Sequence, residues 1–538
     1  MTWLAETAML AHGWRRFVML VVAGAVAGLS VPPLFFLPAL FVAFPFWVWA
    51  LDGAETRRGL RRIFGPAFSI GFAYGWGYFT VALHWLGAAF LIEGGYLLAV
   101  MPVAILSLAA LIALFWGLAS ALAHLFWSHG ALRIVALASF LSLAEYARGT
   151  LFSGFPFDLL GYALTANDEM MQLASVIGIY GLTALCTLLV MTPALIWPAD
   201  ARGLVARLVP FFLAVAIIAA QVGWGNARIN GTTLIDRTDM RVRMVQPLIT
   251  EHSDILTQTP PEILSRLIEI TTMRTDPADL GLDDITHVVW PESVLPFFLS
   301  TYPETLARVA RMLPDNAMLL TGAPREPAGN GDEDPSDNPG YNAILAIDTN
   351  GEIVASYDKS HLVPFGEYLP LASFWKLFGI RQFVPGTNGW APGDGRRLMS
   401  PPGTPAFIAL ICYEAIFSGD LGADPDKAGF ILNISNDEWF TGSIGPAQHA
   451  HHAQLRAVET GLPMLRATNS GLTMLIDPLG RITAQLPPDE VGVLDVVPSE
   501  KLGLTPLDRF GNSLFFWAMV LGLLIALISR RRAVRPSI

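Results

Sequence analysis

The sequence has little charge and almost no cysteine for its length. Only 15% of its 538 residues are charged and 53% are hydrophobic, whereas a soluble globular protein carries about 25% charged residues. The two cysteines, Cys186 and Cys412, lie in dissimilar segments, so a disulfide framework is not expected. The net charge of −11 gives no support for nucleic-acid binding. The first apolar stretch has no small-residue cleavage site and leads directly into others, so no signal peptide is expected. The composition predicts a membrane protein.

The apolar residues are concentrated in eight segments, most of them near the length of about 20 residues that a bilayer requires. The expected spans are Phe17–Ser30, Leu34–Leu51, Ala67–Ile92, Tyr96–Phe126, Ile134–Tyr146, Met171–Trp197, Leu204–Trp224 and Leu514–Ser529. The Gly-rich stretch Gly71–Gly77, like Pro32 and Pro33, suggests tight turns or close approaches of helices. We therefore predict an α-helical multi-pass domain of eight transmembrane helices, seven in residues 1–225 and the eighth in residues 513–530.

Basic residues fall in alternate loops between these expected spans. They are Arg15, Arg16, Arg57, Arg58, Arg61, Arg62, Arg133, Arg202, Arg530, Arg531, Arg532 and Arg535. The intervening short loops carry almost none, Arg148 being the exception. Because loops rich in Lys and Arg stay in the cytoplasm, both termini are predicted to be cytoplasmic, and the segment between the seventh and eighth spans is predicted to lie outside it.

Residues 239–499 show a different pattern, in which short β-rich runs alternate with helical stretches. The expected strands are Met240–Gln246, His287–Trp290, Met318–Thr321, Ile344–Asp348, Ile353–Asp358, Phe407–Cys412, Phe430–Ser435, Leu465–Thr468, Thr473–Asp477 and Gly492–Val497. The expected helices are Pro260–Arg274, Pro303–Met312 and Gly445–Thr460. Asp348–Gly351 and Asp477–Gly480 are typical of hairpin turns. About 260 residues are ample for one hydrophobic core, so we predict one α/β domain here.

Three of the expected strands end in residues that can do chemistry together. Glu292 follows Pro291, which stops a strand ladder, and Lys359 and Cys412 lie at the ends of two other strands. Singly, such residues are more often a solvated carboxylate, a surface lysine and an inert buried cysteine. If the three residues meet at one sheet edge, however, Glu292 could accept the proton of the Cys412 thiol. Lys359 could then favour the thiolate and bind the oxyanion of a tetrahedral intermediate. The backbone N–H of Tyr413 is placed to be a second oxyanion donor.

The expected helix Gly445–Thr460 carries a cluster of histidines. His449 and His452 are three residues apart and could face a metal together, but no acidic or sulfur ligand joins them at a recognisable spacing. We therefore expect them to pack within the fold, and we expect neither a metal nor a cofactor. Arg456, Glu459 and Arg466 resemble a buried ion-pair scaffold rather than catalysts.

Several sequence strings point to a known family. Trp290–Glu292, the lysine within Tyr357–Glu367, and Ile411–Glu414 look like the Glu-Lys-Cys triad of the nitrilase superfamily. Together with the apolar half, they closely resemble the apolipoprotein N-acyltransferase family over nearly the whole chain. The strings His361–Glu367 and Asn433–Phe440 make this resemblance far more specific than a triad alone.

The resemblance implies a fold and a reaction. The family's fold is a nitrilase-like, four-layer α-β-β-α sandwich set on eight transmembrane helices. Its reaction moves a fatty acyl chain from a phospholipid, typically phosphatidylethanolamine, to the cysteine. The chain then passes from the thioester to the α-amine of the diacylglyceryl cysteine that begins a lipoprotein. The resemblance places the protein in a bacterial inner membrane with a periplasmic catalytic domain.

The resemblance also assigns roles residue by residue. Glu292 becomes the base, Lys359 the partner of the oxyanion and thiolate, and Cys412 the nucleophile. Residues that match the family's supporting acids and pocket positions are Glu367, Glu414, Tyr413, Trp439 and Pro370. The loop Pro247–His252 departs from the family's pattern and lacks its tryptophan, which leaves the contacts of that loop open.

Two other functions remain possible from the residues. A membrane-anchored amidase of the nitrilase type would use the same triad with water as the acceptor, and a non-catalytic membrane scaffold or transporter would not use it. Eight spans and the aromatic segment Leu371–Ile380 favour the transferase, because a soluble substrate would need neither. This segment is either an arm that dips into lipid or a helix packed on the core. Phe152–Asp158 is either an interfacial packing element or part of a lipid-facing entry.

Overall fold

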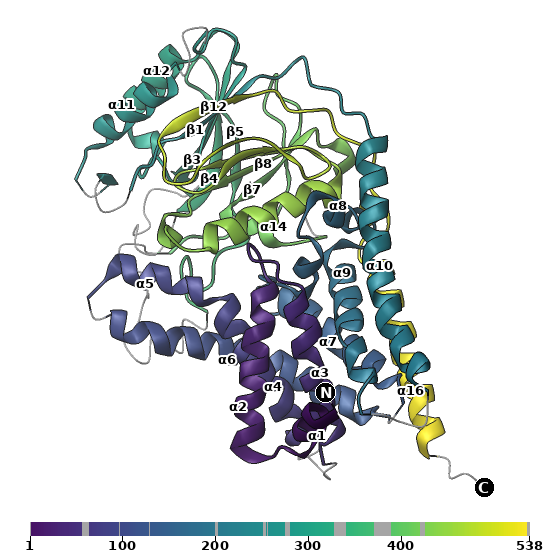
Figure 1. The fold of residues 1–538 in the computed structure, drawn as a ribbon. Coiled ribbons are helices and arrows are strands. Elements are labelled where there is room, and N and C mark those ends of the chain that lie inside the picture. The colour runs from purple at the N-terminus through teal and green to yellow at the C-terminus, as the bar shows by residue number, and fades with distance from the viewer. Residues whose placement is uncertain are drawn as a thin grey trace. The chain divides into compact units, whose positions relative to one another are not determined.

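The chain folds into two compact units. The computed structural model describes residues 2–55, 64–95, 97–128, 130–198, 203–250, 254–255, 257–274, 280–327, 340–370, 389–419 and 425–534. The first unit, here called the helical unit, comprises Met1–Thr232, Gly442–Gln448 and Arg509–Ile538. The second, here called the sandwich unit, comprises Thr233–Thr441 and His449–Asp508. Figure 1 shows the helices of the one and the sheets of the other.

Helices occupy each of the eight apolar segments of the helical unit. They are α2 (Gly13–Ala27), α3 (Pro38–Asp52), α4 (Pro66–Ala82), α5 (Gly87–Glu93), α6 (Leu97–Leu125), α7 (Arg133–Thr150), α9 (Ala174–Val190), α10 (Leu204–Gly231) and α16 (Ser513–Val534). Two further helices, α1 (Thr2–Leu10) and α8 (Asp168–Met171), were not expected. Helix α4 packs against both α2 and α6. A Cβ atom on Gly77 would lie 2.0 Å from the carbonyl oxygen of Val21, so the Gly-rich stretch does permit the close helix approach that was predicted.

Five of the described helices are long and apolar enough to cross a membrane, or six if a bent pair is one span. The bent pair corrects the expectation of one continuous span at Ala67–Ile92, because Pro66–Ala82 and His84–Ile92 meet at 53°. Helix α3 has only 15 residues, and α7 carries Glu145 and Arg148 among its buried residues. Length and composition therefore support several spans, and the number eight stays a prediction.

A buried ion pair fastens the loop that follows α7. Arg148 donates to Glu145 at 2.8 Å, and Trp116 Nε1 donates to the same carboxylate at 2.7 Å. Arg148 Nη1 also donates to the carbonyl oxygens of Phe155 and Phe157. An unpaired charge would be costly at this position, so the pair explains why Arg148 breaks the pattern of the loop charges. Its role is helix and loop packing.

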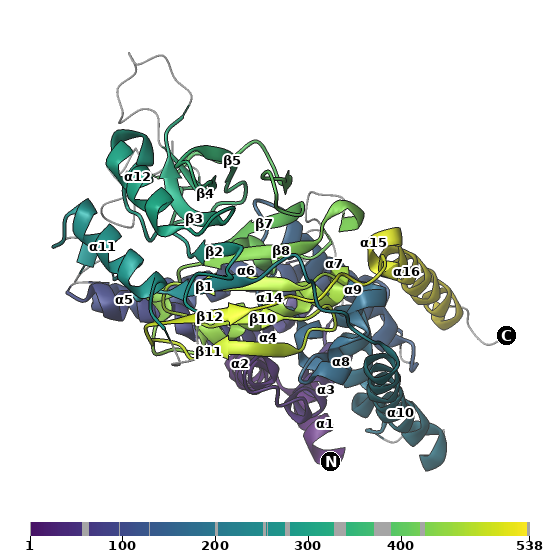
Figure 2. The same cartoon turned by 90° about the horizontal axis from the view of Figure 1, so that it is seen from above.

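The sandwich unit contains two six-stranded sheets. The first has the order β12-β1-β2-β3-β4-β5 and the second β11-β10-β9-β8-β7-β6. Figure 2 shows the labels of the first sheet, and those of β11, β10, β8 and β7 in the second, in this order. The first sheet is formed by β12 (Gly492–Val496), β1 (Val242–Gln246), β2 (His287–Trp290), β3 (Met318–Arg325), β4 (Tyr341–Ile347) and β5 (Ile353–Asp358). The second is formed by β11 (Ile482–Leu486), β10 (Thr473–Ile476), β9 (Met464–Thr468), β8 (Phe430–Ser435), β7 (Phe407–Ile411) and β6 (Leu398–Met399).

Helices cover the outer faces of the two sheets, which gives the layers α-β-β-α (Figure 1). The residues of β2 show why. Val288 and Trp290 join the core that includes residues of α11 (Pro260–Thr271) and α12 (Pro303–Met312), whereas Val289 joins the core between the two sheets. Successive strand residues point to opposite faces, so a strand buried on both faces is apolar throughout. Helix α14 (Gly445–Thr460) packs on the second sheet in the same manner.

All ten expected strands are present within a few residues of their predicted bounds. Two of the strands in the described residues were missed. β6 has two residues, and β11 is largely exposed with a polar pattern, so neither shows the apolar run on which the predictions relied. The predicted end of one strand was also wrong by one residue, because β7 ends at Ile411 and Cys412 begins the 3-10 helix η8 (Cys412–Ile416).

Candidate active site

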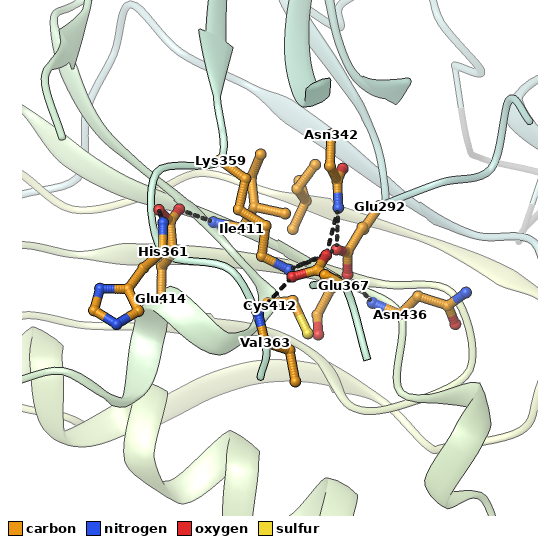
Figure 3. Close-up of polar contacts among 12 residues, drawn as sticks. Glu292, Asn342, Lys359, His361, Val363, Glu367, Ile411, Cys412, Glu414 and Asn436 are labelled. Atoms are coloured by element: carbon orange, nitrogen blue, oxygen red, sulfur yellow. Dashed lines mark hydrogen bonds and ion pairs between the residues drawn. The ribbon is translucent and has the colours of Figure 1, made fainter. Parts of the chain in front are cut away.

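The three chemically reactive residues meet where three strands end. Glu292 follows β2, Lys359 directly follows β5 of the same sheet, and Cys412 directly follows β7 of the other sheet. Figure 3 shows the side chains of Glu292, Lys359 and Glu367 meeting, with the Cys412 sulfur beside them. Side chains at the ends of core strands are held rigidly, so the position of each group follows from the sheet behind it.

Lys359 is a buried cation between two carboxylates. Its Nζ lies 2.8 Å from Glu367 Oε1 and 3.3 Å from Glu292 Oε1, and the residue is 1% exposed. Burial alone would lower the pKa of Lys359, but the charges of Glu292 and Glu367 outweigh it and hold this pKa well above its ordinary value. Lys359 therefore keeps its positive charge at neutral pH.

Both oxygens of the Glu292 carboxylate have hydrogen-bond donors. Asn342 Nδ2 donates to Oε1 and the backbone N–H of Asn436 donates to Oε2, both at 2.8 Å. The Asn342 amide also lies 3.3 Å from Glu367 Oε1. These donors orient the carboxylate and leave it able to accept a proton. Asn342 lies on β4, where the antiparallel register pairs its neighbour Ala343 with Asp358 at the end of β5.

Cys412 has an unusual backbone conformation and a raised pKa. Its φ of +49° lies in the left-handed region, which is uncommon for a non-glycine residue and costs free energy unless the surroundings enforce it. Burial raises the pKa of the Cys412 thiol, the charge of Glu292 raises it further, and Lys359 acts in the opposite direction. The thiol is thus protonated at rest and needs a base when it reacts.

Glu414 joins the loop of Cys412 to the loop of Lys359. Its Oε2 accepts the backbone N–H of Ile411 at 2.9 Å. Its Oε1 accepts the backbone N–H of Ser360 at 2.9 Å and that of His361 at 3.1 Å. The carboxylate is fully buried, so it acts as an internal cap that fixes the two loops relative to each other.

Comparisons with known proteins show the family of the chain. The Carbon-nitrogen hydrolase family matches residues 278–498, and the Apolipoprotein N-acyltransferase N-terminal domain matches residues 23–192. The apolipoprotein N-acyltransferase of Rhodopseudomonas palustris is 38% identical over 91% of this chain and 91% of its own. That of Agrobacterium fabrum is 39% identical over 92% of each, and that of Brucella suis is 38% identical over 98% of this chain and 97% of its own.

The chain belongs to the apolipoprotein N-acyltransferase family. Its sandwich unit has the nitrilase-like fold of the carbon-nitrogen hydrolases, and its apolar helices make it a membrane protein. Glu292, Lys359 and Cys412 all fall inside residues 278–498, which match the Carbon-nitrogen hydrolase family; their catalytic roles stay predictions.

The remaining predicted residues lie at differing distances from this centre. Glu367 and Glu414 contact the catalytic loops directly, as described above. The Tyr413 ring is buried and lies edge-on to Phe417, with centroids 5.2 Å apart. Trp439 lies in η10 (Glu438–Phe440), three residues after Asn436, and Pro370 precedes residues 371–388. Pocket roles for Trp439 and Pro370 stay predictions, and the segment Leu371–Ile380 lies outside the described residues.

The loop that departs from the family pattern is tied to the site through Asn469. Of Pro247–His252, the structure describes residues 247–250. The Asn469 side chain accepts the N–H of Ile249 and donates to the carbonyl oxygen of the same residue. The Asn469 amide also lies 3.3 Å from Asn436 Oδ1, and the N–H of Asn436 binds Glu292. The atypical loop thus has a specific backbone connection to the centre even without the family's tryptophan.

Sequence reasoning missed two groups of site residues. Asn342 gave no signal, because nothing near it in the chain marks it as a partner of Glu292. Asp437 lies in the string Asn433–Phe440 and His449 in the expected helix Gly445–Thr460, but only the structure places them beside Cys412. Donor atoms of Cys412, Asp437 and His449 lie within 4.8 Å of one another. Among the residues that the structure describes, these three form the cluster whose donor atoms lie close enough to hold a metal. The cluster differs from the pair His449 and His452, which the sequence suggested.

Proposed function

We propose that this protein transfers a fatty acyl chain from a phospholipid, through a thioester on Cys412, to the α-amine of the diacylglyceryl cysteine of lipoproteins. The observation that carries the proposal is the buried ion pair of Lys359 and Glu292 at 3.3 Å beside a protonated cysteine, in a chain that belongs to the apolipoprotein N-acyltransferase family. Glu292, Lys359 and Cys412 are the catalytic residues in this proposal.

In the first half-reaction, Cys412 attacks the ester carbonyl of the phospholipid. Its thiol proton moves to Glu292 while sulfur bonds to the carbonyl carbon. The oxyanion that forms is stabilised by the Lys359 ammonium and by the N–H of Tyr413. When the intermediate collapses, the ester bond breaks, and the lysophospholipid oxygen leaves with the proton held by Glu292. A general base is needed here because the pKa of the Cys412 thiol is raised.

In the second half-reaction, the lipoprotein amine attacks the thioester. The amine transfers a proton to Glu292, the carbon–nitrogen bond forms, and the carbon–sulfur bond breaks. Sulfur leaves as a thiolate, which is a better leaving group than an alkoxide, and it recovers its proton from Glu292. Lys359 stabilises the oxyanion in both halves, which explains why its cation is held by two carboxylates.

The proposal includes a location and the number of spans. Eight transmembrane helices place both termini in the cytoplasm by the distribution of basic loops. They place residues 239–499 on the periplasmic side of the inner membrane, between the seven spans of residues 1–225 and the eighth at 513–530. Phosphatidylethanolamine is the proposed donor. A donor that is held in the bilayer suits a catalytic domain that is tethered to apolar helices, which a soluble substrate would not require.

Intact mass spectrometry tests the proposal directly. Purified protein is incubated with phosphatidylethanolamine and then with a diacylated lipopeptide. We expect one added acyl mass, which the lipopeptide discharges as an N-acylated product. Cys412→Ala should gain no mass, whereas Cys186→Ala, which removes the other cysteine, should behave like the unmodified protein.

The same experiment separates the competing functions. An adduct that decays equally fast with and without lipopeptide would indicate an amidase-type hydrolase. Absence of any adduct with phosphatidylethanolamine, phosphatidylglycerol and cardiolipin would favour the non-catalytic scaffold and would contradict the proposal.

A further inference from the structure

His449 contacts the backbone of the nucleophile from α14. Its Nε2 lies 3.0 Å from the carbonyl oxygen of Cys412, and its Nδ1 lies 2.9 Å from Asp437 Oδ1. Both partners are oxygens that accept hydrogen bonds, so each ring nitrogen satisfies its partner only when it carries a proton. Arg466 Nη2 lies farther from Nδ1, at 3.3 Å, and it has a better acceptor in Asp437 Oδ2 at 2.9 Å. The network therefore favours a doubly protonated, positively charged ring.

Asp437 is the anion of this network and lies between His449 and Arg466. Burial alone would raise the pKa of the Asp437 carboxyl, but the charges of His449 and Arg466 outweigh it and place the pKa well below its usual range. The Ser435 hydroxyl donates to the same carboxylate at 3.0 Å. With both ring nitrogens of His449 protonated, Asp437 would lie between two cations, close to Cys412.

The contact acts on a backbone segment that needs support. Cys412 holds a φ of +49°, which persists only when surrounding contacts enforce it. The peptide that joins Cys412 to Tyr413 is planar, so its carbonyl and its N–H point in opposite directions. A donor that fixes the carbonyl on one side therefore aims the N–H of Tyr413 to the other side. A cation on the carbonyl also polarises the amide and makes this N–H a stronger donor.

We propose that His449 is a positively charged positioning residue: it holds the Cys412 carbonyl, maintains the strained turn of the nucleophile and aims the N–H of Tyr413 at the reaction centre. This inference builds on the proposed acyl transfer. The contact geometry on which it depends is independent of the acyl donor and acceptor. A metal bound by Cys412, Asp437 and His449 is less favourable, because the coordinating ring nitrogen would have to give up its proton and the ion would add a cation beside Arg466.

The alkylation rate of Cys412 tests the charge of His449 without any lipid substrate. Folded protein in detergent is treated with iodoacetamide from pH 7 to pH 10, and mass spectrometry follows the modification of Cys412. The charged groups around this thiol are Glu292, Lys359, Asp437, His449 and, behind them, Arg466. His449→Gln keeps a hydrogen-bond donor but removes the charge, so we expect alkylation about tenfold slower across this range, which corresponds to a rise of about one unit in the thiol pKa.

Two further variants make the result specific. His449→Lys keeps a cation and a donor, and it should alkylate within about threefold of the unmodified protein. His451→Gln is the matched control on the same helix, because burial lowers the pKa of His451 to about 3 and keeps its ring neutral; it should leave the rate unchanged. Equal rates for His449→Gln and the unmodified protein, or equal losses in His449→Gln and His449→Lys, would overturn the proposal.

Asp437→Asn provides a second test if His449→Gln fails to fold. Removal of this carboxylate alone should lower the thiol pKa, because the charge of Asp437 raises it. If His449 depends on Asp437 for its proton, the variant also loses the positive charge of the imidazolium, which offsets the fall in the thiol pKa. Asp437→Asn should then be alkylated no faster than the unmodified protein. Alkylation accelerated tenfold or more would show that His449 contributes no charge. A protein that alkylates as expected but forms no thioester with phospholipid would refute the proposed function and leave this inference intact.

Discussion

Glu414 offers a strong test of how the two catalytic loops are held together. Five donors meet its carboxylate. Oε2 accepts the N–H of Ile411, and Oε1 accepts two backbone N–H groups, of Ser360 and His361, together with the hydroxyls of Tyr357 and Ser360. Glutamine has the same shape but only one acceptor oxygen. In Glu414→Gln, the amide nitrogen must therefore face at least one N–H donor.

The expected destabilisation can be worked out from these contacts. One buried donor without a partner costs about 1–3 kcal/mol, and each remaining bond falls from the charge-assisted range of about 1.5–3 kcal/mol to about 0.5–1.5 kcal/mol. Allowing for four donors that share one oxygen, we expect a total loss of about 4 kcal/mol, a large part of the 5–15 kcal/mol that stabilises a typical domain. For a domain of this size the melting temperature should fall by roughly 10 °C.

Thermal unfolding followed by near-UV circular dichroism measures this loss. Tyr357→Phe removes only one of the five donors and should lower the melting temperature by a few degrees. Glu500→Gln, an exposed carboxylate, is the matched control and should leave it unchanged. A shift below 2 °C for Glu414→Gln, or a larger shift for Tyr357→Phe, would refute the reasoning that Glu414 is an internal cap.

Three further predictions concern charge at and near the site. Glu367→Gln removes the carboxylate that lies nearer to Lys359; it should lower the pKa of Lys359 and slow thioester formation about tenfold or more. The control Glu269→Gln changes an exposed carboxylate on α11 and should leave the rate of thioester formation unchanged. Equal rates for the two variants would contradict the role of Glu367. Asn342→Asp places a third carboxylate beside Glu292 and Glu367 and should abolish most activity at pH 8, with partial recovery at pH 6 as a carboxyl group is protonated; a pH-independent loss would indicate misfolding instead. Burial lowers the pKa of His287 to about 4, so the stability it contributes is complete above its unfolded pKa of about 6.5 and should be lost as pH falls to 4, by about 3 kcal/mol. Denaturant unfolding at a series of pH values measures the free energy of unfolding. This loss between pH 6.5 and pH 4 should appear in the wild type and not in His287→Gln.

Much of the site was accessible from the sequence because its residues lie at the ends of apolar strands. The runs before Glu292 and Cys412 are buried on both faces, and a strand of this type is recognisable without any knowledge of its neighbours. The run before Lys359 is partly exposed, and the hairpin turn Asp348–Gly351 in front of it marked it as a strand. The local strings also supplied Glu367 and Glu414, whose contacts to the neighbouring loops the structure then showed. Local pattern was less informative for the membrane half, where α7 buries Glu145 and Arg148 and the third apolar segment is bent.

The tertiary structure alone decided which polar residues surround this core. Asn342 reaches Glu292 because the antiparallel register of β4 and β5 brings it beside Lys359, and register depends on pairing between distant segments. His449 shows a helical pattern in the sequence, yet its contact with Cys412 exists only because α14 packs on the second sheet. The sequence by itself determined the ten apolar strands and the helices that show apolar periodicity, and its local strings pointed to the three reactive side chains; the short or polar elements β6, β11, α1 and α8 left no such pattern. The supporting hydrogen bonds follow from long-range packing, which no local pattern records.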